Sequence, residues 1–265
     1  MNRTVGIIGG GAAGMMAAIW AARSGGHVTI LEGNDRLGKK ILATGNGKCN
    51  LGNEKLDLEA YYTGNPAFLQ ECLGAFGTEE TKKLFRDLGL MLKSKNGYLY
   101  PISEQAAVVL DVLRFAVEAA GVHIVTECKV TKLECKGNGF LVTGSGKTYH
   151  FDKVILACGS KAAPKTGSDG SGYQLAKAMG HRIVPVVPAL VQMKCREDYF
   201  KMVTEIVTKY KNDKRICIWD VYNEPGNSRR TDVTLPNIKR LFEIVRECDP
   251  IQPLTAGVFH IKGDE

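Results

Sequence analysis

The glycines near the N-terminus constrain the fold of this chain more than any other feature. The run TVGIIG at residues 4–9 is short and β-branched, and a glycine-rich turn follows it. The next segment, AAGMMAAIWAARSGG at 12–26, is rich in helix formers, and HVTILEG at 27–33 predicts a second strand that ends on an acid. Strand, turn, helix and strand within about 30 residues form the unit in which the spacing G-x-G-x-x-G indicates dinucleotide binding.

The glycines and the acid of this unit have separate physical roles. Gly9 allows the tight turn, Gly11 lets backbone N–H groups approach a pyrophosphate, and Gly14 lets helix and strand pack closely. The helix N-terminus adds partial positive charge. Glu32, at the end of the second strand, can accept hydrogen bonds from both hydroxyls of an adenosine ribose and would repel a 2′-phosphate. The pattern therefore favours FAD or NAD over NADP, and a flexible glycine turn without a ligand is the alternative.

Composition excludes several classes of protein. The chain has 265 residues, 44% hydrophobic and 24% charged, which is enough for one large α/β domain or two ordinary ones. The net charge of +7 comes from scattered Lys and Arg, so we expect no nucleic-acid partner. The 8 cysteines form no C-x-x-C pair, so we expect no metal site and a cytoplasmic location with reduced thiols. We also expect no signal peptide and no membrane span, since uninterrupted apolar runs of about 18 residues are missing.

The segment NDRLGKKILATGNGKCNLGN, residues 34–53, follows the acid directly. A Walker A loop is excluded, because Leu42 stands where its first glycine would be and neither Ser nor Thr follows Lys48. The glycines and small polar residues suit a backbone that wraps closely around an extended ligand. Arg36, Lys39 and Lys40 can offset phosphate charge.

This segment, together with GGGAAGMMAA and ILACGSKAAPKTGSDGSGYQLAKAMGH, resembles the BaiN-like (YhiN-like) NAD(P)/FAD-dependent oxidoreductases over residues 1–195. The resemblance implies an α/β, Rossmann-like, three-layer domain that binds FAD, with NAD(P)H as a candidate electron donor and a small-molecule substrate. The FAD-binding residues that it implies are Gly9, Gly11, Gly14, Glu32, Arg36, Lys40, Gly45, Gly47, Cys49, Asn50, Val130 and Gly159. Val130 would contact the adenine through its backbone, and for Cys49 we favour packing over redox chemistry.

The segments between these motifs predict a mixed architecture. Residues 77–94 indicate a helix followed by a turn, and 106–121 an apolar helix. Residues 122–159 indicate strands joined by hairpin turns at KGNG and GSGK, which suggests a small antiparallel sheet beside the parallel one.

From about residue 196 the pattern changes to helix (198–211), strand (216–222), helix (235–248) and strand (253–259). The motifs WDVYNEPGN and PIQPLTAGV in this part resemble retaining (β/α)8 cellulase-like glycoside hydrolases over about 200–265. The resemblance implies that Glu224 is the acid/base and that Asn223 donates to the sugar 2-hydroxyl, at the end of a barrel strand.

Retaining hydrolysis requires a second carboxylate about 5–5.5 Å away, and none is visible in this chain. We therefore interpret the chain as a chimera of two truncated families. Residues 1–195 would form an FAD/NAD(P)-binding domain cut before the family's inserted domain, and 196–265 an inactive barrel fragment. The predicted function is an FAD-binding oxidoreductase fragment; the alternatives are a glycoside hydrolase fragment and a non-catalytic nucleotide-binding module. The sequence indicates no oligomeric state.

Overall fold

The computed structural model describes residues 3–56, 58–61, 63–187, 198–223 and 231–257. The chain divides into two compact units, Met1–Val186 and Val187–Glu265. Each unit has its own hydrophobic core and is described by itself below. No helix within the described ranges is long and apolar enough to cross a membrane.

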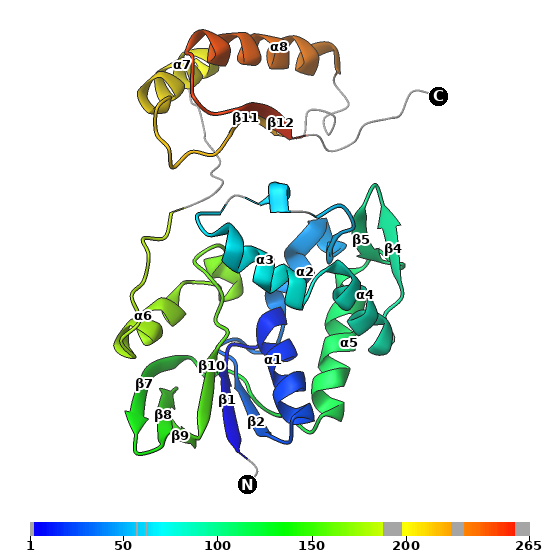
Figure 1. Cartoon of the computed structure of the whole chain (residues 1–265), viewed down its shortest axis with the longest axis vertical. Helices are drawn as coiled ribbons and strands as arrows, with labels where there is room; N and C mark the ends of the chain where they lie inside the picture. Colours follow the sequence, from blue (N-terminus) through cyan, green and yellow to red (C-terminus); the bar gives the residue numbers. More distant parts are fainter. Residues whose placement is uncertain (1–2, 57, 62, 188–197, 224–230, 258–265) are drawn as a thin grey trace. The chain divides into compact units, whose positions relative to one another are not determined.

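The first unit is built on a four-stranded parallel sheet with the order β10-β1-β2-β6, of which Figure 1 labels β10, β1 and β2. Its strands are β1 (Thr4–Ile8), β2 (His27–Leu31), β6 (His123–Val125) and β10 (Lys153–Leu156). Helix α1 (Ala12–Arg23) connects β1 to β2, so the strand, turn, helix and strand expected from the glycine spacing are confirmed. The α/β Rossmann-like fold expected for this part is likewise confirmed.

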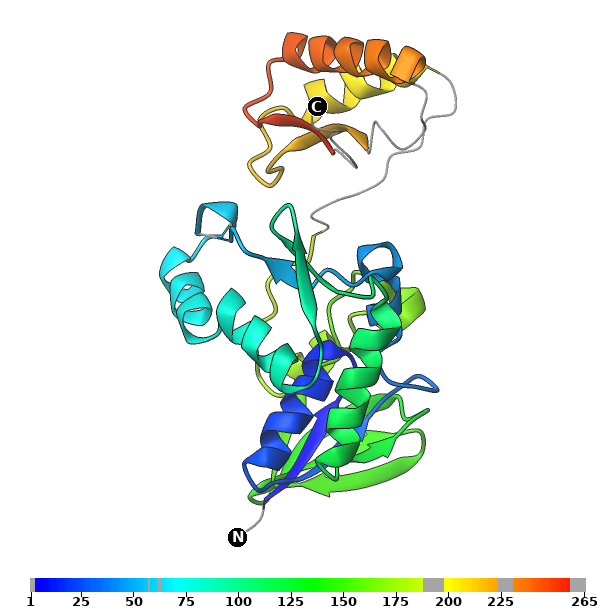
Figure 2. The ribbon, with the colours of Figure 1, turned by 90° about the vertical axis from the view of Figure 1, so that its right-hand side faces the viewer.

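One face of this sheet is covered by α1 and by α5 (Ala106–Ala119), which lie side by side in Figures 1 and 2. Ile7 and Ile30 of the sheet are fully buried together with Met15 of α1 and Leu113 of α5. The apolar periodicity of both helices produces this layer, because residues three and four apart share one helix face.

The opposite face carries a three-stranded antiparallel sheet of β7 (Val130–Lys136), β8 (Gly139–Gly144) and β9 (Lys147–Phe151). Alternation along β1 places Gly6 on this side, where an added Cβ would overlap the ring of Phe151. The antiparallel sheet and its two hairpin turns agree with the sequence prediction, since two-residue turns with glycine are determined locally.

Shorter elements complete the first unit. They are α2 (Lys39–Ala43), a 3₁₀ turn (Thr44–Gly47), β3 (Gly52–Asn53), a 3₁₀ turn (Leu58–Ala60), α3 (Pro66–Ala75), α4 (Thr78–Asp87), β4 (Leu92–Lys95), β5 (Tyr98–Pro101), a 3₁₀ turn (Pro164–Thr166) and α6 (Ser171–Ala178). Strands β3, β5 and β4 form a separate antiparallel sheet, in that order.

The second unit contains α7 (Tyr199–Tyr210), β11 (Trp219–Asn223), α8 (Thr231–Glu247) and β12 (Leu254–Gly257). Strands β11 and β12 pair in parallel, so the expected order of helix, strand, helix and strand is confirmed in the described residues. Helix α8 begins one turn earlier than the sequence suggested and includes Pro236. Many α/β folds contain such a two-stranded parallel unit, so this arrangement does not show the partial barrel that we expected.

Candidate functional site

A cavity of about 510 Å³ lies at the carboxyl ends of the parallel strands of the first unit. Gly9 follows β1, Glu32 follows β2 and Gly159 follows β10 closely, and all three residues line the cavity. Ligands of open parallel sheets bind outside these strand ends, because the loops and helix N-termini converge there. The position of the cavity therefore follows from the topology of the sheet.

The three motif glycines lack side chains for different reasons. A Cβ on Gly9 would lie 2.6 Å from the Ala157 carbonyl oxygen, and one on Gly14 would overlap the Gly9 carbonyl oxygen. Gly11, in contrast, lines the cavity and would place its Cβ in open space, with no heavy atom within 4 Å. Packing within the protein explains the first two glycines. The third leaves room for a ligand that approaches the backbone, as an FAD pyrophosphate does.

The N-terminus of α1 borders the same cavity. Gly11 is its N-cap and provides no side-chain cap, and Ala12 and Ala13 of the first turn line the cavity. The first N–H groups of a helix lack partners within the helix, and they carry partial positive charge. This end of the cavity therefore fits a phosphate group.

Glu32 is 7% exposed, and protein N–H groups hold both of its carboxylate oxygens. Its Oε2 accepts from the Gly10 N–H at 2.6 Å. Its Oε1 accepts from the backbone N–H of Asn34 at 2.7 Å and from Asn34 Nδ2 at 2.6 Å. Sequence reasoning missed Gly10 and Asn34. An Asn two residues after the acid is the one available signal, since Asn often bonds locally to neighbouring groups.

Basic side chains also line the cavity, and an acidic one lies among them. Lys39, Lys40, Lys129 and Lys165 contribute to its wall. Lys129 Nζ pairs with Asp169 Oδ2 at 2.8 Å, across 40 residues of sequence. Hydrogen bonds from Lys129 and Ser171 hold the pKa of Asp169 well below its usual range. Lys39 Nζ pairs with Asp35 Oδ1 at 2.8 Å, so Lys40 and Lys165 supply the positive charge that favours an anionic ligand.

The glycine-rich loop at 44–50 adopts an unusual backbone. Asn46 and Cys49 have φ of 53° and 56°, in the left-handed region that non-glycine residues seldom occupy. Lys48 of this loop pairs with Glu104 at 2.9 Å, and Lys93 of β4 pairs with the same carboxylate at 2.6 Å. These hydrogen bonds lower the pKa of Glu104 to about 2. Ion pairs therefore connect the loop to β4.

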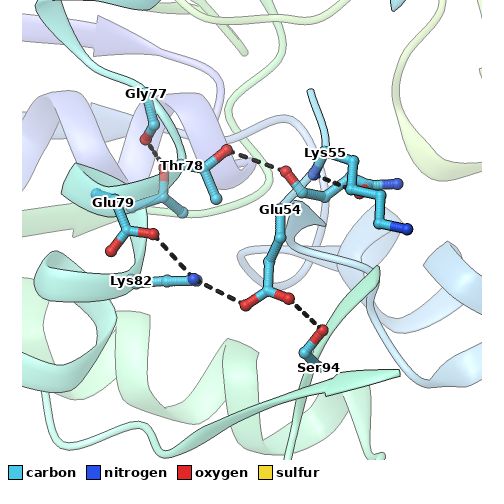
Figure 3. A network of polar contacts seen from close by, with 9 residues as sticks. Glu54, Lys55, Gly77, Thr78, Glu79, Lys82 and Ser94 are labelled. Atoms are coloured by element: carbon cyan, nitrogen blue, oxygen red, sulfur yellow. Dashed lines mark hydrogen bonds and ion pairs between the residues drawn. The ribbon is translucent and has the colours of Figure 1, made fainter. Parts of the chain in front are cut away.

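A second polar network holds the end of the same segment (Figure 3). Glu54, which follows β3, pairs with Lys82 of α4 at 2.8 Å and accepts from the Ser94 hydroxyl of β4 at 2.6 Å. The Thr78 hydroxyl donates to the Asn53 carbonyl oxygen at 3.1 Å. Carboxylates at two points thus connect the glycine-rich segment to β4.

The structure brings together part of the predicted FAD site. The predicted residues that line the cavity are Gly9, Gly11, Glu32, Lys40, Val130 and Gly159. Those outside its lining are Gly14, Arg36, Gly45, Gly47, Cys49 and Asn50. Cys49 is buried, and burial raises the pKa of its thiol, which supports the packing role favoured above.

The predicted glycosidase residues belong to the second unit. Asn223 ends β11, and Glu224 lies outside the described residues. The carboxylate of Asp220, on the same strand, accepts from the Gly257 N–H at 3.1 Å.

Comparisons with known proteins identify relatives of the chain. A family model described as "HI0933-like protein Rossmann domain" matches residues 3–262. The chain is 49% identical over 213 residues to the 3-dehydro-bile acid delta(4,6)-reductase of Clostridium scindens, covering 80% of this chain and 52% of that protein. It is 29% identical over 186 residues to the ribosomal RNA dihydrouridine synthase of Escherichia coli, covering 70% of this chain and 46% of that protein. The chain thus spans about half the length of these curated relatives.

Among solved structures, the 3-ketosteroid-delta4-(5alpha)-dehydrogenase of Rhodococcus jostii has a TM-score of 0.46 and 18% identity, covering 68% of this chain and 54% of that one. These comparisons do not support our predictions that the chain is a chimera and that its C-terminal part is a glycoside hydrolase fragment. The family match crosses residue 196 as one match, and neither curated relative has a glycosidase name. A short motif such as Asn-Glu-Pro and a common α/β unit carry too little information to identify a family.

Proposed function

Because the chain belongs to the HI0933-like Rossmann-domain family of FAD-dependent oxidoreductases, we propose that its first unit binds the adenosine and pyrophosphate parts of FAD in the cavity at the strand ends. FAD is the cofactor of this family. The open space beside Gly11, which no protein atom fills, is the observation that carries the proposal.

We assign the residues by their chemistry. Glu32 accepts from the adenosine ribose, and the N-terminus of α1 at Gly11–Ala13 receives the pyrophosphate. Lys40 offsets phosphate charge from the cavity wall, and Val130 borders the adenine. When bound, FAD supplies hydride transfer, whereas these residues bind and orient it.

For the reaction we propose the reduction of a carbon–carbon double bond conjugated to a carbonyl group in a small molecule, with NAD(P)H as electron donor. The names of the curated relatives support this class, since one is a delta(4,6)-reductase and the others are dihydrouridine synthases. The higher identity to the bile acid enzyme favours a small molecule over RNA.

A flavin titration tests the cofactor site. Purified protein should quench FAD fluorescence with saturable binding and should bind FAD more tightly than NADP, because Glu32 repels a 2′-phosphate. Tighter binding of NADP would contradict the assignment of Glu32.

Anaerobic mixing with NADH or NADPH tests electron transfer. Bleaching of the flavin absorbance supports the oxidoreductase. An intact flavin spectrum that neither nucleotide changes would support the alternative, a non-catalytic nucleotide-binding module.

A further inference from the structure

The carboxylate of Glu32 has few acceptor positions left for a ligand. A carboxylate offers about four such positions, two on each oxygen. Asn34 occupies both positions on Oε1, through its backbone N–H at 2.7 Å and its Nδ2 at 2.6 Å. Gly10 occupies one position on Oε2, at 2.6 Å. One position on Oε2 therefore remains.

The protein holds Asn34 in this arrangement from several sides. Its carbonyl oxygen accepts from the Glu127 N–H at 2.8 Å. Its Nδ2 also reaches the Thr166 carbonyl oxygen at 3.4 Å. The two atoms next to the end of the Asn34 side chain, Glu32 Oε1 and the Thr166 carbonyl oxygen, are both acceptors. The hydrogen bonds are therefore satisfied only when the amide nitrogen, and not the amide oxygen, faces them. A Cβ on Gly167 would lie 2.5 Å from the same nitrogen, so the loop packs directly against it.

We propose that Asn34 determines how Glu32 recognises the adenosine ribose: it fills Oε1, so that the carboxylate accepts one ribose hydroxyl, through Oε2, rather than both. The inference rests on the proposed function, which places the adenosine at Glu32. It replaces the expectation that both hydroxyls bond to this acid. Asn34 is a positioning residue in this scheme, because it acts through Glu32.

Calorimetric titration of the flavin-free full chain with ADP, 2′-deoxy-ADP and 3′-deoxy-ADP tests the proposal without any need for activity. In the unsubstituted protein, one deoxy analogue should bind about 10-fold or more weakly than ADP, the scale for one hydrogen bond to a charged group. The other should bind within about twofold of ADP, since its missing hydroxyl has no acceptor on Glu32.

Variants of Asn34 supply the second half of the test. Asn34→Ala frees one position on Oε1, so both deoxy analogues should then bind more weakly than ADP. Asn34→Leu, which is similar in size but carries no donor, should repeat the Ala pattern if the Ala variant does not fold. Asn138→Ala, in the exposed β7–β8 turn, is the matched control and should bind like the parent.

The outcomes separate the two proposals. Equal losses for both deoxy analogues in the parent, or an unchanged pattern in the Ala and Leu variants, would overturn the role of Asn34 alone. Absence of ADP binding in a folded parent would overturn the adenosine site, and this inference with it.

Discussion

Gly11 and Gly14 belong to one motif, but the structure separates their roles at the scale of single residues. Gly11 has an extended backbone and open space beside it, whereas Gly14 has the Gly9 carbonyl oxygen where its Cβ would be. A change to alanine should therefore affect ligand binding at one position and folding at the other.

Gly11→Ala should change the unfolding free energy by no more than about 1 kcal/mol, the scale of an N-cap change, and should weaken FAD binding by about 1.5–3 kcal/mol, because the added methyl group displaces the pyrophosphate from its hydrogen bonds to the helix N-terminus. Gly14→Ala should lower the unfolding free energy by about 1–3 kcal/mol, because it overpacks a tight contact. Urea unfolding and FAD titration measure the two effects. A destabilised Gly11 variant with normal FAD affinity would contradict the assignment.

Glu32→Ala should weaken FAD binding by about 1–3 kcal/mol through loss of a charged acceptor. It also leaves the N–H groups of Gly10 and Asn34 without their acceptor, so thermal stability should fall as well. Fluorescence titration and a melting curve measure both quantities. An unchanged FAD affinity in a folded variant would remove Glu32 from the site.

At the scale of elements, two carboxylates connect the glycine-rich segment to β4. Neighbouring residues of a strand point to opposite faces, and here Lys93 bonds to Glu104. Ser94, the next residue, bonds to Glu54 (Figure 3). The strand is thus connected to the segment at Lys48, through Glu104, and just after it at Glu54, one from each face.

The ion pairs of Glu104 predict a pH dependence. The pKa of this carboxyl is about 2 in the folded chain and ordinarily 4.5, so the folded state favours its ionised form. Its stabilising effect is complete above pH 4.5 and is lost as the pH falls toward 2. The urea midpoint of the parent should therefore fall more between pH 5 and pH 3 than that of Glu104→Gln. Parallel curves for the two proteins would show that the ion pairs do not stabilise the loop.

At the scale of the whole molecule, the two units have separate cores. Leu241 is fully buried in the second unit, among residues of α7, α8 and β11. Each unit also contains one of the two tryptophans, Trp20 in α1 and Trp219 in β11, so fluorescence can follow each unit separately.

Leu241→Ala should destabilise the second unit by about 2–5 kcal/mol, as expected for a cavity in a packed core. In a Trp20→Phe background, Trp219 reports on the second unit, and its unfolding transition should shift to a lower denaturant concentration. In a Trp219→Phe background, the transition of the first unit and its FAD affinity should stay unchanged. Loss of FAD binding in the Leu241 variant would show that the cofactor site depends on the second core.

Hydrolysis provides a separate check on the motif at the end of β11. Cellulose-like oligosaccharides should stay intact with the purified protein, and Glu224→Gln should change nothing, because retaining hydrolysis needs a second carboxylate about 5–5.5 Å away. Turnover that this substitution abolishes would reveal such a partner.

Local sequence patterns were enough to predict β1, α1, β2 and the β7–β9 hairpins. Glycine spacing, apolar periodicity and two-residue turns act over a few residues, so the chain specifies them without distant partners. The same patterns predicted that Gly9, Gly11 and Glu32 would meet, since the carboxyl ends of parallel strands share one edge of the sheet. The short motif at 219–227 was misleading, because a few residues do not identify a family.

The local chain places Asn34 beside Glu32, and the tertiary structure decided which distant groups complete the surroundings of this acid. The pairing of Lys129 with Asp169 and the contact of Asn34 with Thr166 join segments 40 and 132 residues apart, and no local pattern specifies such partners. The number of acceptor positions left to a ligand depends on which N–H groups packing brings to a buried carboxylate. The sequence determined that an acid stands at the end of β2 with Asn34 two residues after it. The packing of the Gly10 N–H group against that acid, and of the Thr166 carbonyl oxygen against Asn34, determined how much of the acid a ligand can use.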